Sequence, residues 1–238
     1  GILASLGIVI TMVEQTGLGA RISFRMLALA GGILVVLLLL AMATSILFGL
    51  GMPTPAAYIV VAALVAPALT TSETFTIQPL TAHMFVFYFA MLSAITPPVA
   101  ISVAVGSRIA DSSFLSSCVQ ALRLGAPGFV IPFAFVANNE LIQWTSTTAF
   151  AFPVVLAGTI ALIVATTGFD GAKALSAPIR LVYIAAGFAA MFGSVIGDGM
   201  VGMGVQALAA VLVVLSLVRA RYLVGYDVER ARETSASD

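Results

Sequence analysis

Charged side chains are scarce in this sequence of 238 residues. Only 8% of the residues are charged, 61% are hydrophobic and the mean hydropathy is +1.15, which leaves too little polar surface for a water-soluble globule. Ten basic and ten acidic residues give no net charge, so there is no basic face to attract nucleic acid. The composition predicts an all-α protein that forms a polytopic transmembrane helical bundle. We expect it to lie in the lipid bilayer and to bind no nucleic acid.

Cysteine and histidine are almost absent. A single cysteine, Cys118, excludes an internal disulfide framework, and a single histidine, His83, excludes the usual metal-ligand sets. A serine hydrolase would need that histidine beside a nucleophilic serine, and the sequence has no Gly-x-Ser-x-Gly run. An aspartyl enzyme would need two aspartates in the membrane, whereas Asp198 stands alone. We predict no enzymatic activity and no cofactor, and we read His83 as a boundary residue hydrogen-bonded near the water interface.

Two long windows without charge contain breaks in helix propensity. The first window runs from Met26 to Ser72. Near its middle, helix propensity is low and backbone donors are missing, because two glycines and two prolines occur within Gly49-Leu50-Gly51-Met52-Pro53-Thr54-Pro55. We therefore expect a helix over 27–48, a break, and a helix over 55–69. In the second window, Ser93-Ala94-Ile95-Thr96-Pro97-Pro98 stops the helix midway.

The remaining apolar segments predict further helices and an incomplete beginning. The first stretch, Gly1 to Val13, would be about 20 Å long as a helix, short of the roughly 30 Å hydrocarbon core. We expect a C-terminal fragment of a longer protein that begins within a helix. Further helices are expected at Leu124 to Ala137, Thr147 to Thr166, Leu181 to Ile196 and Met203 to Val218.

Basic residues predict the sidedness of the helices. Threading the expected helices places Arg21 and Arg25 on one side of the membrane. The other eight lie on the opposite side: Arg108, Arg123, Lys173, Arg180, Arg219, Arg221, Arg230 and Arg232. By the positive-inside rule the second side, with the C-terminus, is cytoplasmic.

Hydroxyl groups accompany both breaks. Backbone groups freed within hydrocarbon cost several kcal/mol each unless protein, water or an ion satisfies them. Such breaks persist where they line a cavity, and the oxygens of Thr54, Ser93 and Thr96 suit a hard monovalent cation. Two alternatives stay open at this point, namely packed proline kinks without a site and a channel or structural membrane subunit without coupled transport.

The motifs at these breaks resemble a known transporter family. The residues that carry the resemblance are Leu50-Gly51-Met52-Pro53-Thr54-Pro55-Ala56-Ala57-Tyr58-Ile59, Ala66-Pro67-Ala68-Leu69, His83-Met84-Phe85-Val86-Phe87-Tyr88-Phe89 and Leu92-Ser93-Ala94-Ile95-Thr96-Pro97-Pro98-Val99-Ala100. In order and spacing they resemble the large, DctM-like permease of the tripartite ATP-independent periplasmic (TRAP) transporters, especially the fused permeases of the TAXI type. The similarity covers roughly residues 1–141, followed by additional C-terminal transmembrane helices over 142–218 and a polar cytoplasmic tail over 219–238.

The resemblance implies an architecture and a function. Residues 27–69 would form a re-entrant helical hairpin, and 81–106 a discontinuous helix, in the second inverted repeat of an elevator-type transporter. The family implies sodium-coupled symport of carboxylate-bearing solutes across a bacterial or archaeal inner membrane. The partners implied are a periplasmic TAXI-type substrate-binding protein and a small membrane subunit or its fused equivalent.

Carried over residue by residue, the resemblance also implies a site. Gly51, Thr54 and Pro55 would form the hairpin tip. Ser93, Thr96 and Pro97 would form the helix break, with Na⁺ at Gly51, Thr54, Ser93 and Thr96. Many family members have an aspartate before the final proline of the tip, where this chain has Thr54, so the departure bears directly on the coupling ion.

Overall fold

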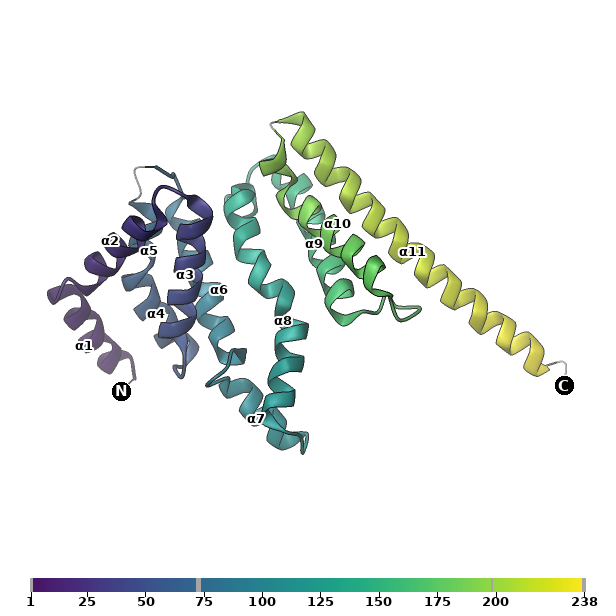
Figure 1. The fold of residues 1–238 in the computed structure, drawn as a ribbon, viewed down its shortest axis with the longest axis horizontal. Coiled ribbons are helices and arrows are strands. Elements are labelled where there is room, and N and C mark those ends of the chain that lie inside the picture. Colours follow the sequence, from purple (N-terminus) through teal and green to yellow (C-terminus); the bar gives the residue numbers. More distant parts are fainter. Residues whose placement is uncertain (1, 72–73, 198, 237–238) are drawn as a thin grey trace. The chain divides into compact units, whose positions relative to one another are not determined.

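Helices make up nearly all of the structure. The computed structural model describes residues 2–71, 74–197 and 199–236, so Asp198 lies outside the described residues. Apart from an isolated bridge between Phe169 and Ala174, the described residues contain no strand (Figure 1). The predicted all-α fold is confirmed. The chain divides into two compact units, Gly1–Ile142 and Gln143–Asp238.

The first unit is built around α6. This helix contacts α3, α4, α5 and α8. Its Phe85 and Phe89 are fully buried, and their rings lie 5.3 and 5.8 Å from that of Phe133 on α8. The elements of this unit are α1 (Ile2–Gln15), α2 (Leu18–Ala30), α3 (Leu34–Gly49), α4 (Thr54–Leu64), α5 (Ala66–Thr70), α6 (Pro79–Leu92), the 3-10 turn η1 (Ser93–Ile95), α7 (Ile101–Ile109), α8 (Phe114–Ala137) and the 3-10 turn η2 (Asn139–Leu141).

The helix predicted over 27–48 is wrong in its first part. Gly31 and Gly32 take φ values of +57° and +79°, a left-handed conformation that ends helices and that glycine adopts without steric cost. Helix α2 therefore ends at Ala30, and α3 begins at Leu34. The prediction gave weight to the glycine and proline cluster further along and overlooked this pair.

The helix predicted over 55–69 is also interrupted. Helix α4 ends at Leu64 and α5 starts at Ala66, because Pro67 has no N–H to donate to the carbonyl of Ala63. Helix α2 packs at this point, where a methyl group placed on Gly19 would lie 2.7 Å from the Ala63 oxygen. The interruption thus lets the two helices approach closely.

Two later helices start earlier than predicted. Helix α8 begins at Phe114 rather than Leu124, with the Ser113 hydroxyl accepting a hydrogen bond from the Ser116 amide. In the second unit, α10 begins at Ala177 rather than Leu181 because Arg180 is part of the helix. Its Nε donates to the carbonyl of Ala165, 2.7 Å away. Charged side chains at membrane boundaries can stay within a helix when their long stems reach polar partners.

In the described residues of the second unit the helices are α9 (Thr148–Thr167), α10 (Ala177–Ile196) and α11 (Met200–Ala236), the last of which extends beyond both ends of the helix predicted from Met203 to Val218. Among the described residues, four helices are long and apolar enough to cross a membrane. These are Phe114–Ala137, Thr148–Thr167, Ala177–Val195 and Met200–Tyr222. The 16 residues of α3 and the 14 of α6 reach only about 24 and 21 Å, short of a complete crossing. The chain is therefore a multi-pass membrane protein that also contains short apolar helices.

A glycine pair lets α9 and α10 pack closely. A methyl group on Gly158 would lie 2.9 Å from the carbonyl oxygen of Gly187 and 2.7 Å from Cγ of Met191. Small residues at such crossings are a common source of van der Waals packing between membrane helices. We therefore treat Gly158 as the residue that sets the distance between these helices.

We predict that Gly158→Ala lowers the thermal stability of the purified protein, because the added methyl group pushes against backbone. Overpacking of this kind costs about 1–3 kcal/mol. Gly204→Ala on α11 is the matched control, since a methyl group there meets no atom within 4 Å. The measurement is the Tm of each variant in detergent, and equal Tm values for the two variants would contradict this packing.

Candidate functional site

The first broken stretch lies between α3 and α4. Helix α3 ends at Gly49, Gly51 takes a φ of +77°, and α4 begins at Thr54. The amides of Leu50 and Met52 donate weakly to carbonyls of the last turn of α3, at 3.4 Å. From the described residues, the carbonyls of Leu50 and Gly51 receive no hydrogen bond. This stretch thus presents backbone oxygens that accept no hydrogen bond from the described residues.

The second broken stretch lies between η1 and α7. It contains Thr96, whose hydroxyl donates to the carbonyl of Leu92 at 2.8 Å. It ends at Ala100, a residue with a φ of +37° that precedes α7. Within the part of the chain that the structure describes, no donor reaches the carbonyls of Ile95 and Pro97. This stretch therefore also presents unpaired backbone oxygens.

The two broken stretches lie against each other. A methyl group placed on Gly49 would lie 2.8 Å from Ser93 Oγ and 2.9 Å from the carbonyl oxygen of Ala90. One placed on Gly51 would lie 3.9 Å from Cγ1 of Val99. Segments more than 40 residues apart in the sequence are thus brought into contact at the points where their helices are interrupted. We call this arrangement the paired-break site, and define it by residues 49–55 and 93–100.

The six predicted site residues all lie in the paired-break site, but in different environments. Thr54 and Pro55 are exposed in the first turn of α4. Ser93 is buried and its hydroxyl donates to the Ala90 carbonyl at 2.6 Å. Gly51 is exposed, whereas Thr96 and Pro97 are half-buried. Because the Ser93 and Thr96 hydroxyls donate their protons to their own helix, their oxygen lone pairs are available to a cation.

Sequence reasoning missed one polar group close to this site. Ser45 lies one turn before Gly49 on α3, is fully buried, and its hydroxyl has no hydrogen-bond partner among the described residues. Ala41, Ser45 and Gly49 form a stripe of small residues at four-residue spacing on α3, and all three are buried. That spacing is the small-xxx-small pattern of close membrane-helix contacts, and it was the signal that could have identified this face.

His83 lies on α6 and contacts α4. Its Nδ1 is 3.1 Å from the hydroxyl oxygen of Tyr58, and the Tyr58 ring also packs edge-on against Phe87 at 5.4 Å. The histidine was predicted to be hydrogen-bonded at a boundary, and the structure supplies Tyr58 as a partner. This pair links the helix that follows the first break to the helix that precedes the second.

Acidic and sulfur ligands do not gather anywhere in the described residues. No group of three or more His, Cys, Asp or Glu side chains comes together in this part of the chain. The residues that define the paired-break site include no carboxylate, thiol or imidazole, so the oxygens that they offer are those of carbonyl and hydroxyl groups.

The fold and the site together define a class of protein: a multi-pass helical membrane protein with two interrupted helices that meet within one packed unit. Comparison with known families identifies it further. The family model described as the tripartite ATP-independent periplasmic transporter, DctM component, matches residues 1–150. The chain therefore belongs to the DctM family, the membrane permease component of TRAP transporters. No match was found to a curated protein or to a solved structure.

Membership of this family confirms the resemblance to the DctM-like permease, while the TAXI type stays a prediction. It is a family of transporters rather than enzymes. It also implies, as partners of the permease, a periplasmic binding protein and a small membrane subunit. The match covers the whole first unit, which contains the paired-break site.

We predict that Gly49→Ala disrupts the paired-break site, because the methyl group would contact both Ser93 Oγ and the rigid Ala90 carbonyl. The expected cost is about 1–3 kcal/mol of stability, together with loss of transport. Gly106→Ala on α7 is the control, since a methyl group there meets no atom within 4 Å. Thermal unfolding and uptake by the complete permease are measured, and a Gly49→Ala protein that matches Gly106→Ala in both would argue against the contact.

Proposed function

We propose that this chain is the substrate-translocating part of a secondary transporter that uses Na⁺ to take up carboxylate-bearing small solutes. The observation that carries the proposal is the contact between the two broken stretches at Gly49 and Ser93. Family membership gives the class of transporter, and the contact between the broken stretches supports the paired-break site as the proposed place for solute and ion.

Helix ends of both polarities lie at the paired-break site. Helices α3 and η1 end there, and α4 and α7 begin there. The C-terminal ends of helices carry partial negative charge and the N-terminal ends partial positive charge. A sodium ion is favoured beside the free carbonyls, and a carboxylate beside the amides that open α4 and α7. This pairing favours symport, since the bound cation offsets the charge of the carboxylate.

The uncharged oxygen ligands of the paired-break site also suit a coupling ion that must dissociate after transport. Thr54 occupies the position where many family members have aspartate, so the site carries no fixed negative charge of its own among its defining residues. Neutral oxygens bind a monovalent cation without the desolvation cost of a buried carboxylate. Release of the ion then leaves no unpaired charge in the membrane.

The hairpin over 27–69 shares one hydrophobic core with α6, the first half of the discontinuous helix over 81–106, whereas Val103 of α7 packs in a separate cluster with Cys118 of α8. Buried residues of that core come from α2, α3, α4, α5 and α6, including Met26, Leu37, Val61 and Phe89. Since close-packed cores move as bodies rather than deform, we propose that both broken stretches move together as part of an elevator-type transport domain. Substrate would be delivered from the periplasm by a binding protein of the TAXI type.

We predict that Thr54→Ala and Thr96→Ala weaken Na⁺-dependent uptake in the complete permease. Loss of an oxygen ligand to a charged group costs about 1.5–3 kcal/mol, which corresponds to an increase of roughly tenfold or more in the Na⁺ concentration at half-maximal uptake. The measurement is uptake into proteoliposomes from a panel of organic acids at varied Na⁺ concentration.

Thr44→Ala is the matched control for Thr96→Ala. The Thr44 hydroxyl makes the same kind of bond to its own helix, donating to the Leu40 carbonyl at 2.7 Å, but lies outside the paired-break site. Its uptake should keep the Na⁺ dependence of the parent protein. Unchanged Na⁺ dependence in both Thr54→Ala and Thr96→Ala, with normal insertion, would refute the assignment of the ion site.

A further inference from the structure

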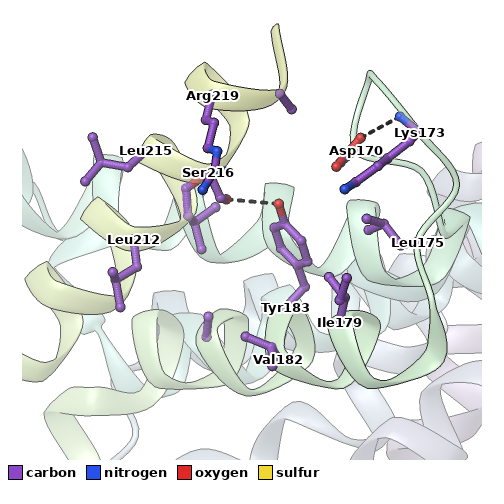
Figure 2. A pocket seen from close by; sticks show the side chains of 13 residues that line it. Asp170, Lys173, Leu175, Ile179, Val182, Tyr183, Leu212, Leu215, Ser216 and Arg219 are labelled. Carbon is purple, nitrogen blue, oxygen red and sulfur yellow. Dashed lines mark hydrogen bonds between the residues drawn. The ribbon is translucent and has the colours of Figure 1, made fainter. Parts of the chain in front are cut away.

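A cavity of about 610 Å³ lies within the second unit, between α10, α11 and the loop that joins α9 to α10 (Figure 2). The hydroxyl of Tyr183 on α10 donates to Ser216 Oγ on α11 at 2.9 Å, and this bond fixes how the two helices align. Ile179 and Ala186 on α10, and Val213, Arg219 and Ala220 on α11, line the same cavity. We call this cavity the α10–α11 pocket.

One end of the α10–α11 pocket is cationic. Lys173 on the loop and Arg219 on α11 line it, and Figure 2 shows Lys173 extending from the loop toward the space above Tyr183. The lining also includes one carboxylate, Asp170. Two cations against one carboxylate leave one uncompensated positive charge at this end.

The Asp170 carboxylate is engaged by the loop itself. Its Oδ1 accepts hydrogen bonds from the amides of Ala172 and Lys173, both at 2.9 Å. Partial burial, which would raise the pKa of Asp170, is outweighed by these amide bonds and by the charge of Lys173, so its pKa is lowered. The carboxylate thus stays ionised and holds the loop, and among the described residues Arg219 has no ion-pair partner.

The other end of the pocket is aliphatic. Its lining residues here are Val182 and Ala186 on α10, and Leu212 and Leu215 on α11. Both helices are long and apolar enough to span a membrane, so this part of the pocket lies where acyl chains are the surrounding solvent. Arg219 lies near the end of the apolar span Met200–Tyr222, where a long cationic side chain reaches the headgroup region.

We propose that the α10–α11 pocket binds an anionic phospholipid, with the phosphate between Lys173 and Arg219 and an acyl chain along the aliphatic walls. The pocket combines two cationic side chains with an aliphatic wall that runs from Leu175 and Ile179 to Leu212, and such a lipid offers a phosphate and an acyl chain to these groups. Basic pockets at the ends of membrane helices recognise anionic headgroups in this way. The site lies wholly in the second unit and does not depend on the proposed transport function.

The test measures lipid binding to the complete permease in detergent by native mass spectrometry. Phosphatidylglycerol and phosphatidylcholine with identical acyl chains are compared, and sn-glycerol phosphate serves as the headgroup without chains. We expect tighter binding of phosphatidylglycerol, weakened about fivefold by Lys173→Gln or by Arg219→Gln. Arg221→Gln is the control, because it removes the same charge from α11 outside the pocket lining.

Two further variants separate recognition from folding. Lys173→Arg combined with Arg219→Lys keeps both charges and should keep phosphatidylglycerol binding, whereas Ala186→Phe fills the aliphatic end and should weaken it. The proposal is overturned if phosphatidylcholine binds as tightly as phosphatidylglycerol, or if Arg221→Gln weakens binding as much as Arg219→Gln. It is equally overturned if sn-glycerol phosphate binds as tightly as the whole lipid.

Discussion

The close approach of α3 to the end of α6 is the contact on which the rest of the first unit depends. Gly49 has no side chain, so the end of α3 can lie beside Ser93 and the Ala90 carbonyl. Both helices are interrupted just beyond this contact, and unpaired carbonyls of Leu50, Gly51, Ile95 and Pro97 are left close to it. Backbone oxygens without donors are costly in a membrane unless a polar species accompanies them. The contact thus brings together backbone carbonyls that need a cation or water as a partner.

The proposed transport requires that the unpaired carbonyls beside this contact exchange one polar partner for another during the transport cycle. Carbonyls and hydroxyls bind an ion without fixed charge, and the N-terminal ends of α4 and α7 favour a carboxylate. The hydrophobic core around Phe85, Phe89 and Val61 joins α3 and α4, on both sides of the first break, to α6, which precedes the second break. In the elevator-type motion proposed above, a packed core of this kind would keep the site intact, since interiors are packed at native density. The second unit adds three helices and a separate amphipathic pocket.

Sequence reasoning predicted the breaks well and the helix ends less well. The Pro97-Pro98 pair predicted where α6 would stop, because proline removes donors and restricts the preceding residue. The starts of α8 and α10 were predicted too late, because the prediction places helix boundaries at Arg123 and Arg180. Both residues lie inside these helices. The motifs predicted that the two breaks converge, but not that Gly49 and Ser93 are the residues that make the contact. It depends on tertiary packing, and only the buried small residues Ala41 and Ser45 on the same face indicated it.

The most direct test is a thiol cross-link between Gly51→Cys and Val99→Cys in the complete permease, with Cys118, which is buried and free, replaced by alanine. A protease site between α5 and α6 makes the cross-link visible as two fragments that stay joined. The close approach at Gly51 and Val99 predicts efficient disulfide formation in native membranes. A Gly51→Cys and Gly106→Cys pair should give none. Absence of cross-linking in the first pair, in a folded and inserted protein, would contradict the paired-break site.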